Sequence, residues 1–252
     1  MFNLAGKVAV ITGGNGGIGL GMGCGLAEAG AKIVIAARNE KKMETAKAAL
    51  EAKGTQVLTI PTDVGKKDSV DNMIAEAKAH FGRLDILINN AGINAGGPAE
   101  ELCLEDWEYV LNTNLTSAFL CSHAIYPYMK QLGAGKIINI GSMMSIFGHR
   151  LAPAYAASKG GIVQFTRTLA CSWAEDNIQA NAILPGWIDT EMTQILRERL
   201  PEVHQSVIDR TPANRWGTIE DLSGIAVFLA SSASDFITGA AIPVDGGYAI
   251  QG

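Results

Sequence analysis

The segment Thr12-Gly13-Gly14-Asn15-Gly16-Gly17-Ile18-Gly19 decides the fold, because it joins a short β-branched run to a helix-like segment. A turn this rich in glycine adopts positive φ angles and carries no side-chain bulk. Its backbone can therefore approach a pyrophosphate held at the positive end of the following helix. A tight turn without a ligand is the alternative, but the position after the first strand favours dinucleotide binding. The candidate phosphate-binding residues are Gly13, Asn15, Gly16, Gly17, Ile18 and Gly19.

The predicted helix after this turn carries three more glycines, Gly21, Gly23 and Gly25. Each costs about 0.5–1 kcal/mol relative to alanine in a helix interior unless close packing compensates. The sequence alone offers no reason for all three.

Short β-branched runs alternate with longer helix-like segments along the whole chain. The predicted strands are 8–12, 32–36, 56–60, 84–89, 136–140, 179–184 and 241–244, and the predicted helices include 40–53, 69–81, 104–132, 153–175 and 220–230. This pattern predicts an α/β fold: a Rossmann-type, doubly wound, seven-stranded parallel sheet with helices on both faces and strands buried on both faces. We predict one domain, residues 1–252, with ligands beyond the C-terminal ends of the strands.

Composition narrows the classes of function. The 252 residues carry a net charge of −5, so no broad basic face is expected to bind nucleic acid or a membrane surface. Cys24, Cys103, Cys121 and Cys171 are scattered, which predicts buried thiols and no metal site. No apolar run approaches the roughly 18 residues that span a bilayer, and no signal segment precedes the first strand, so we expect a cytoplasmic protein.

A second group of residues indicates acid and base chemistry. Tyr155 and Lys159 lie four residues apart on a predicted helix, and Ser142 follows a predicted strand. This spacing puts the phenol and the ammonium on one face, where the positive charge is expected to lower the pKa of Tyr155 from about 10. A hydroxyl such as that of Ser142 can stabilise an oxygen that becomes alkoxide-like. Tyr-x-x-x-Lys alone is more often an ordinary helical pair, but Ser142 and the glycine turn together favour catalysis.

With these residues in place, the chain resembles the short-chain dehydrogenase/reductases, in the branch of about 250 residues. The resemblance covers essentially the whole chain, and the combination of motifs is highly specific. It includes the glycine turn, Asp63, Asn89-Asn90-Ala91-Gly92, Asn114, Ser142, Tyr155, Lys159, Pro185-Gly186 with Thr190, and Val244-Asp245-Gly246-Gly247.

The resemblance implies a role for each catalytic candidate. Tyr155 would pass a proton to or from the substrate oxygen while hydride moves at the nicotinamide, and Ser142 would polarise the carbonyl. Lys159 would bind the nicotinamide ribose and lower the tyrosine pKa. Asn114 would hold a water that relays protons to solvent; the alternative is an asparagine paired locally within its helix.

The resemblance also implies the cofactor contacts. Asp63 and Val64 would lie along the adenine, and Asn90, Ala91 and Gly92 would flank the adenosine, whereas Asn89 would support the sheet. Beyond Pro185 and Gly186, Ile188 and Thr190 would reach the carboxamide; a helix cap at Thr190 is compatible with this role.

The residues that end the second strand predict the choice of nicotinamide. Ala37 stands where an acid would grip the ribose 2′-hydroxyl, and Arg38 follows it. A guanidinium binds phosphate through parallel hydrogen bonds, so we expect NADP(H). NAD(H) is the alternative, because neutral Asn15 stands where many NADP-using members carry a basic residue and Arg38 can be a solvated surface charge.

Substrate and assembly follow mainly from the resemblance. Residues 187–216 would form the substrate loop with a helix near 193–210, and Met144, His149 and Trp187 would line the cavity. Plain core packing, or a loop cap for His149, is the alternative. The chain looks most similar to sugar-acid or polyol dehydrogenases and to 3-oxoacyl carrier-protein reductases. In related enzymes, the helix that carries Ile162, Phe165, Leu169 and Trp173 and the long helix before it pair with their copies in a second subunit, which implies a homotetramer. The alternative is that this apolar stripe packs entirely against its own sheet. A non-catalytic nicotinamide sensor and a methyltransferase are the alternatives, and both leave Tyr155 with Lys159 unexplained.

Overall fold

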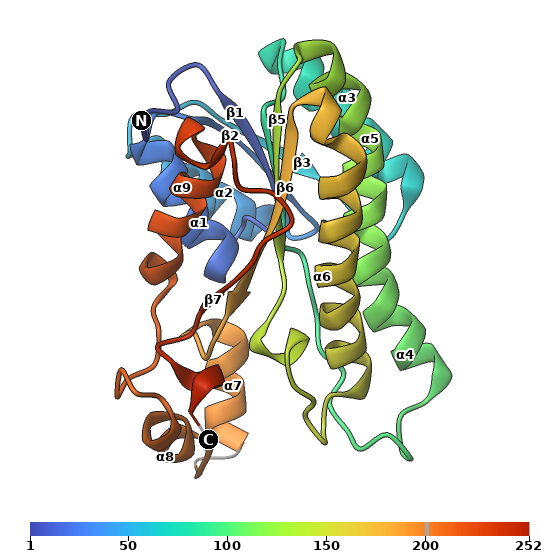
Figure 1. Cartoon of the computed structure of the whole chain (residues 1–252), viewed down its shortest axis with the longest axis vertical. Coiled ribbons are helices and arrows are strands. Elements are labelled where there is room, and N and C mark those ends of the chain that lie inside the picture. Colours follow the sequence, from blue (N-terminus) through green and yellow to red (C-terminus); the bar gives the residue numbers. More distant parts are fainter. Residues whose placement is uncertain (200–201, 252) are drawn as a thin grey trace.

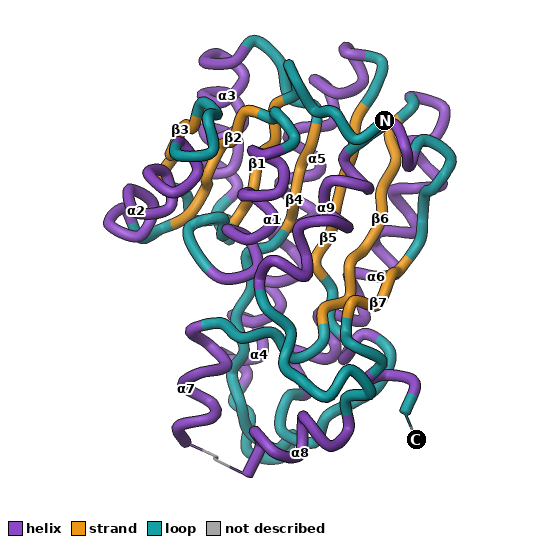
Figure 2. The backbone as a smooth tube through the Cα atoms, turned by 90° about the vertical axis from the view of Figure 1, so that its left-hand side faces the viewer, coloured by secondary structure: helices purple, strands orange, loops and turns teal. Residues whose placement is uncertain are grey.

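The computed structural model describes residues 1–199 and 202–251, and its centre is a seven-stranded parallel sheet. The strand order is β3-β2-β1-β4-β5-β6-β7, and it reverses direction between β1 and β4 (Figure 2). The strands are β1 (Val8–Thr12), β2 (Lys32–Ala37), β3 (Val57–Pro61), β4 (Ile86–Asn89), β5 (Gly135–Ile140), β6 (Ile178–Pro185) and β7 (Ala241–Val244). The predicted fold is therefore confirmed.

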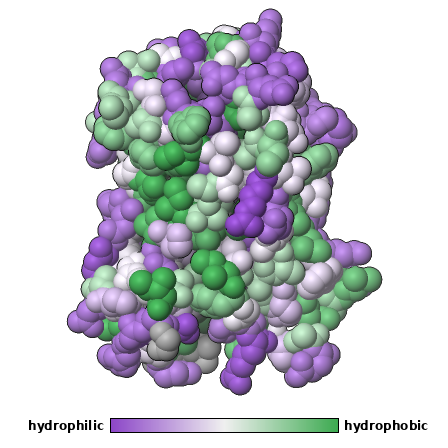
Figure 3. All heavy atoms as spheres, viewed as in Figure 1, coloured by the Kyte–Doolittle hydropathy of each residue, from purple (hydrophilic) through white to green (hydrophobic). Residues whose placement is uncertain are grey.

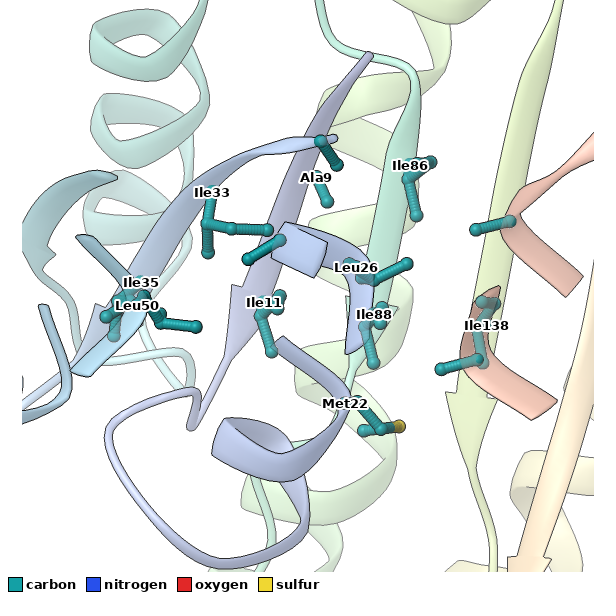
Figure 4. Packing of buried hydrophobic residues seen from close by; sticks show 14 of the residues in the cluster. Ala9, Ile11, Met22, Leu26, Ile33, Ile35, Leu50, Ile86, Ile88 and Ile138 are labelled. Carbon is teal, nitrogen blue, oxygen red and sulfur yellow. The ribbon is translucent and has the colours of Figure 1, made fainter. Parts of the chain in front are cut away.

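Helices cover both faces of this sheet (Figure 1). One face carries α1 (Gly17–Glu28), α2 (Glu40–Glu51) and α9 (Ser223–Ala230), and the other carries α3 (Lys67–Phe81), α5 (Ser117–Leu132) and α6 (Pro153–Trp173). Successive residues of a strand point to opposite faces, so β1 sends Ile11 into one buried cluster and Val10 into the other. Figure 4 shows the first cluster, in which Ile11 lies near Met22 of α1.

One predicted helix is interrupted in the structure. The segment predicted at 104–132 consists of α4 (Leu104–Leu111), a π-helical turn (Asn112–Thr116) and α5. Apolar periodicity continues through this interruption, which is why the sequence predicted a single helix. Within the piece predicted at 193–210, the structure describes α7 (Glu191–Arg199) and α8 (Glu202–Arg210), and positions 200–201 lie outside the described residues.

The prediction that every strand is buried on both faces is wrong for the two edge strands. In β3 only Val57 and Ile60 are buried, and every residue of β7 is at least partly exposed. An edge strand has a neighbouring strand on one side only, so its side chains are covered less completely. Apolar side chains therefore gather on the surface over β7 (Figure 3).

Close packing against α9 and the turn before it explains two of the three glycines in α1. A Cβ on Gly21 would lie 2.4 Å from the carbonyl oxygen of Ile219, and one on Gly25 would lie 2.7 Å from the Cβ of Ser223. The Ser223 hydroxyl also donates to the Gly21 carbonyl at 2.8 Å. Gly23 is less crowded, since its Cβ would meet the ends of the Ile11 and Leu50 side chains, at 3.3 and 3.5 Å.

The prediction of buried thiols is wrong for two of the four cysteines. Cys121 is buried and Cys24 is partly buried, but Cys103 and Cys171 are exposed. Cys103 lies at the N-cap of α4, where its sulfur accepts from the Asp106 amide. In the described part of the chain, no helix is long and apolar enough to cross a membrane. Likewise, residues 1–199 and 202–251 contain no group of three or more His, Cys, Asp or Glu that could hold a metal.

Candidate active site

The candidate site lies at the C-terminal edge of the sheet, where the segments after β1, β4, β5 and β6 meet. The Thr12 hydroxyl at the end of β1 accepts from the amides of Asn90 and Ala91, at 3.0 and 3.1 Å. This contact joins the glycine turn to the loop after β4. Both segments lie at the point where the strand order reverses, which is where open α/β sheets bind ligands.

The glycine turn is held by a side chain of the neighbouring loop. The Asn90 amide group donates to the carbonyls of Thr12 and Gly13, at 3.0 and 3.1 Å. A Cβ on Gly19 would lie 2.5 Å from this amide nitrogen, and Gly13 needs its φ of 65°. The Asn90 side chain therefore shapes the turn itself.

The same turn fits a pyrophosphate. A Cβ on Gly16 would meet nothing within 4 Å, so the backbone is open there, and no side chain caps the first turn of α1. Gly17 has a φ of 50°, and a Cβ on it would lie 3.5 Å from the Thr190 methyl group. An anion at a helix N-terminus requires backbone amides that no side chain caps and a backbone that it can approach closely, and this turn offers both. The loop after β6 lies beside the turn.

Tyr155 and Lys159 come together on α6, as their spacing predicts. The Lys159 ammonium lies 5.6 Å from the centre of the Tyr155 ring and donates to the Ile140 carbonyl at 2.6 Å. Lys159 is buried, and this burial lowers its pKa to about 8. A Cβ on Gly92 would lie 3.5 Å from the same ammonium, so the loop after β4 passes directly over it.

The expectation that Lys159 lowers the pKa of Tyr155 is wrong for this structure. Burial raises the pKa of Tyr155, and the Ser142 hydroxyl opposes this shift in part. The ammonium faces the ring and directs a hydrogen bond to the Ile140 carbonyl, so desolvation of the phenolate outweighs attraction.

Ser142 is fixed by a residue that the sequence analysis missed. Ser142 is buried at the end of β5, and its hydroxyl accepts from the Met144 amide at 3.1 Å. The Ser145 hydroxyl accepts from the Ser142 amide and donates to the Lys159 carbonyl at 2.7 Å. One side chain thus ties the Ser142 loop to α6. A serine three residues after a candidate cap is the signal that could have found it.

The Asn114 side chain is fully engaged within the chain. It accepts from the Ile93 amide and donates to the Ile93 carbonyl, at 2.8 and 2.9 Å. Its other amide hydrogen bonds the buried Ser158 hydroxyl at 3.0 Å, which in turn donates to the Tyr155 carbonyl. Asn114 lies in the π-helical turn, which displaces backbone groups from regular α-helical pairing. The alternative of local pairing within the helix is wrong, because Ile93 and Ser158 lie 21 and 44 residues away along the chain, and Ser158 is a partner that the sequence analysis missed.

Asn89 belongs to the support of the sheet. Its amide donates to Asn139 on the next strand at 2.8 Å and to Ser122 on α5 at 3.1 Å. Asn139 continues the chain of hydrogen bonds to Thr166 on α6. This buried network fixes both long helices against β4 and β5.

The residues predicted for the adenosine half lie at the ends of β2 and β3. Ala37 is the last residue of β2, and Arg38 is exposed with its guanidinium 3.3 Å from the Tyr109 hydroxyl. Asp63 is partly exposed and accepts from the Gly65 amide, whereas Val64 is buried. The Arg38 side chain has no carboxylate partner among the described residues, so its charge is available at this edge.

The segment after β6 holds the other predicted cofactor residues. Pro185 ends β6, and a Cβ on Gly186 would lie 2.6 Å from the Asp245 Cα. The Ile188 side chain is buried against Gly217. Thr190 precedes α7, and its hydroxyl lies 3.5 Å from the Thr193 amide, in keeping with a cap.

The three predicted substrate residues differ in exposure. Met144 is partly buried beside Ser142, and Trp187 is partly buried beneath the ring of Tyr248, 6.4 Å away. The indole nitrogen of Trp187 is buried and has no hydrogen-bond partner among the described residues. His149 is exposed and accepts from the Leu151 amide, as the loop-cap alternative predicts.

Comparison with known proteins identifies the class. The sequence model of a family described as "Enoyl-(Acyl carrier protein) reductase" matches residues 13–249. Relatives at 38–45% identity over nearly the whole chain are named dehydrogenases. The chain belongs to the short-chain dehydrogenase/reductase family, as its motifs predicted, and is an oxidoreductase that interconverts a secondary alcohol and a ketone with a nicotinamide cofactor.

Its relatives narrow the class further. The chain is 45% identical to "2-dehydro-3-deoxy-D-gluconate 5-dehydrogenase" of Dickeya dadantii (strain 3937), with 98% of this chain and 97% of that protein covered. It is 38% identical to "Gluconate 5-dehydrogenase" of Gluconobacter oxydans (strain 621H), with 100% and 98% covered. A crystal structure of a gluconate 5-dehydrogenase from Burkholderia cenocepacia J2315, in complex with NADP and tartrate, superposes with a TM-score of 0.93 at 40% identity and covers 98% of this chain and 96% of that one.

Proposed function

We propose that this enzyme interconverts a hydroxyl and a keto group of a sugar acid with NADP(H), and that residues 1–252 form one domain. The observation that carries the proposal is the meeting of Tyr155, Lys159 and Ser142 beneath the Gly92 loop, at the edge that also holds the glycine turn. Related proteins named for gluconate and 2-dehydro-3-deoxygluconate support the choice of substrate.

Each catalytic residue has a defined task in this proposal. A nicotinamide cofactor, when bound, would supply or accept the hydride. Tyr155 donates its proton to the substrate oxygen during reduction and recovers it during oxidation, while Ser142 donates a hydrogen bond to that oxygen. A raised pKa keeps the phenol protonated at neutral pH, which suits reduction. The Lys159 ammonium donates one of its three N–H groups to the Ile140 carbonyl, and the other two would donate to ribose hydroxyls.

Asn114 acts through its backbone in this scheme. Its side-chain oxygen and both amide hydrogens already pair with Ile93 and Ser158. A relay water at this position would therefore bind the Asn114 carbonyl in the π-helical turn rather than the side chain.

The cofactor would extend along the edge from β2 to β6. Its pyrophosphate would lie on Gly13–Gly19 and its nicotinamide near Pro185, Gly186, Ile188 and Thr190, the last two through backbone groups and the Thr190 hydroxyl. Asp63, Val64, Ala91 and Gly92 would border the adenosine. Arg38 would bind the 2′-phosphate, since Ala37 leaves no acid to repel it. NADP in the related Burkholderia enzyme supports this choice.

The substrate would enter beneath residues 187–216, with Met144 and Trp187 on its walls. The buried, unpaired Trp187 indole nitrogen is a donor suited to a hydroxyl-rich substrate. His149 would lie at the rim of the substrate cavity, because its side chain is exposed and accepts from the Leu151 amide in its own loop.

A substrate and cofactor screen tests the proposal. Gluconate, its keto acid, neutral polyols, a 3-oxoacyl thioester and a simple ketone would each be assayed with NADP(H) and NAD(H). We expect the highest kcat/KM with the sugar-acid pair and NADP(H). Preference for the 3-oxoacyl thioester would favour a 3-oxoacyl carrier-protein reductase, which is the second candidate. Binding of NADPH without turnover of any compound would favour a sensor.

We also propose that four copies assemble. Ile162 and Leu169 are buried within the chain, while Phe165 is only partly covered and contacts Phe119, which is 51% exposed. The exposed apolar edge at β7 offers a second contact (Figure 3). Sedimentation that showed only monomer at micromolar concentration would contradict this. Use of the dinucleotide pool supports a cytoplasmic location.

A further inference from the structure

We infer that Arg210 binds the carboxylate of the substrate, an inference that rests on the proposed sugar-acid function. Arg210 is the last residue of α8, and its side chain is exposed. Its guanidinium lies 4.5 Å from the ring centre of Tyr248 and 5.5 Å from that of Phe147.

The two aromatic rings belong to different segments of the proposed site and contact each other, with their centres 6.2 Å apart. Phe147 follows the turn that starts at Ser142, and its amide donates to the Met143 carbonyl. Tyr248 belongs to the C-terminal segment, and its ring contacts Trp187 just beyond Gly186. Arg210 therefore covers a pair of rings that joins the turn after the catalytic serine to the segment after β6.

The charge of Arg210 is uncompensated among the described residues. No carboxylate within residues 1–199 or 202–251 makes an ion pair with it, and no hydrogen bond from its guanidinium to them is present. Two acids that are close in sequence to Arg210 or to Tyr248 have other partners. Asp209 accepts from Gln205, and Asp245 accepts from the amides of Gly247 and Ala249.

Stacking leaves the binding edge of the guanidinium free. A guanidinium that lies on an aromatic ring uses its face, and its five N–H groups remain in the plane for a carboxylate. The aromatic contacts also restrict the side chain, so less entropy is lost when an anion binds. The other arginines near the crevice differ, because Arg197 pairs with Asp189 and Arg215 pairs with Asp221.

Paired substrates test this assignment. Sorbitol differs from gluconate only in carrying CH2OH in place of the carboxylate, so the ratio of their kcat/KM values reports recognition of the charge. In Arg210→Gln we expect this ratio to fall about 10- to 100-fold through KM, the effect of losing a charged hydrogen-bonded pair. Arg210→Lys keeps the positive charge but lacks the planar guanidinium, so its kcat/KM ratio should lie between those of the wild type and Arg210→Gln. Arg150→Gln, on an exposed loop arginine without aromatic contacts, is the matched control and should keep the ratio.

Calorimetric titration with tartrate, in the presence of NADP+, gives a readout that does not depend on turnover. Affinity should fall by a similar factor in Arg210→Gln and should not change in Arg150→Gln. An unchanged ratio and unchanged tartrate affinity in Arg210→Gln would overturn the inference, as would a larger loss in Arg150→Gln. If the wild-type enzyme oxidised neither compound but reduced other ketones, the sugar-acid proposal would fail, and tartrate would then decide whether Arg210 is an anion site at all.

Discussion

Alanine at Gly21 should destabilise the protein although alanine is the better helix former. A Gly→Ala change inside a helix gains about 1 kcal/mol in intrinsic propensity. At Gly21 the new methyl would lie 2.4 Å from the Ile219 carbonyl oxygen, so backbone must move by about 1 Å to reach an ordinary contact of 3.4 Å. That movement also stretches the hydrogen bond from Ser223 to the Gly21 carbonyl. Overpacking typically costs about 1–3 kcal/mol, occasionally more, and the hydrogen bond adds about 1 kcal/mol, so we expect a net loss near 2 kcal/mol.

Other glycines provide matched controls for this prediction. The new methyl group of Gly23→Ala meets the ends of the Ile11 and Leu50 side chains, at 3.3 and 3.5 Å, and the stability of this variant should stay within about 0.5 kcal/mol of wild type. Gly224→Ala has open space in α9 and should gain about 0.5–1 kcal/mol. Urea unfolding followed by circular dichroism at one protein concentration measures all three. The packing argument would be refuted if Gly21→Ala were as stable as the wild type, or if Gly23→Ala lost as much free energy of unfolding as Gly21→Ala.

Three further predictions concern the site. Tyr155→Phe should lower kcat about 10²- to 10⁴-fold while NADPH still binds by fluorescence; full turnover by the variant would remove the proposed acid. Arg38→Ala should reduce kcat/KM for NADPH about 10-fold or more with little effect on NADH, and equal losses with both cofactors would count against a contact with the 2′-phosphate. Burial lowers the pKa of Lys159 to about 8, so between pH 8 and the ordinary lysine value of 10.5 the unfolded chain holds this proton more often than the folded one. The contribution of Lys159 to the free energy of unfolding therefore rises with pH across that window. The urea midpoint of the wild type should increase relative to that of Lys159→Met between pH 7.5 and 9.5. If the urea midpoints of the two proteins changed in parallel with pH, the lowered pKa of Lys159 would be contradicted.

Features set by local sequence were predictable, and features set by distant contacts were not. The glycine turn and the spacing of Tyr155 and Lys159 are local, so the sequence alone indicates the crevice and the catalytic face. The pKa of Tyr155 shifted in the opposite direction because it depends on burial, which helical spacing does not report. The partners of Asn114 follow from the packing of three segments, and no pattern in any one of them indicates that pairing. Arg210 likewise acquires its aromatic neighbours from Phe147 and Tyr248, far from it in the chain.

The tight contact between α1 and the region that begins at Ile219 also bears on how the protein is made. Gly21 and Ser223 are 202 residues apart, so α1 leaves the ribosome long before its packing partner is synthesised. Contacts this distant in sequence are slow to form. The packing of α1 therefore cannot be completed until the last part of the chain has been synthesised, and an N-terminal fragment that stops before Ile219 would leave the glycine face of α1 without its packing partner. Such a fragment is a poor candidate for a free-standing cofactor-binding module.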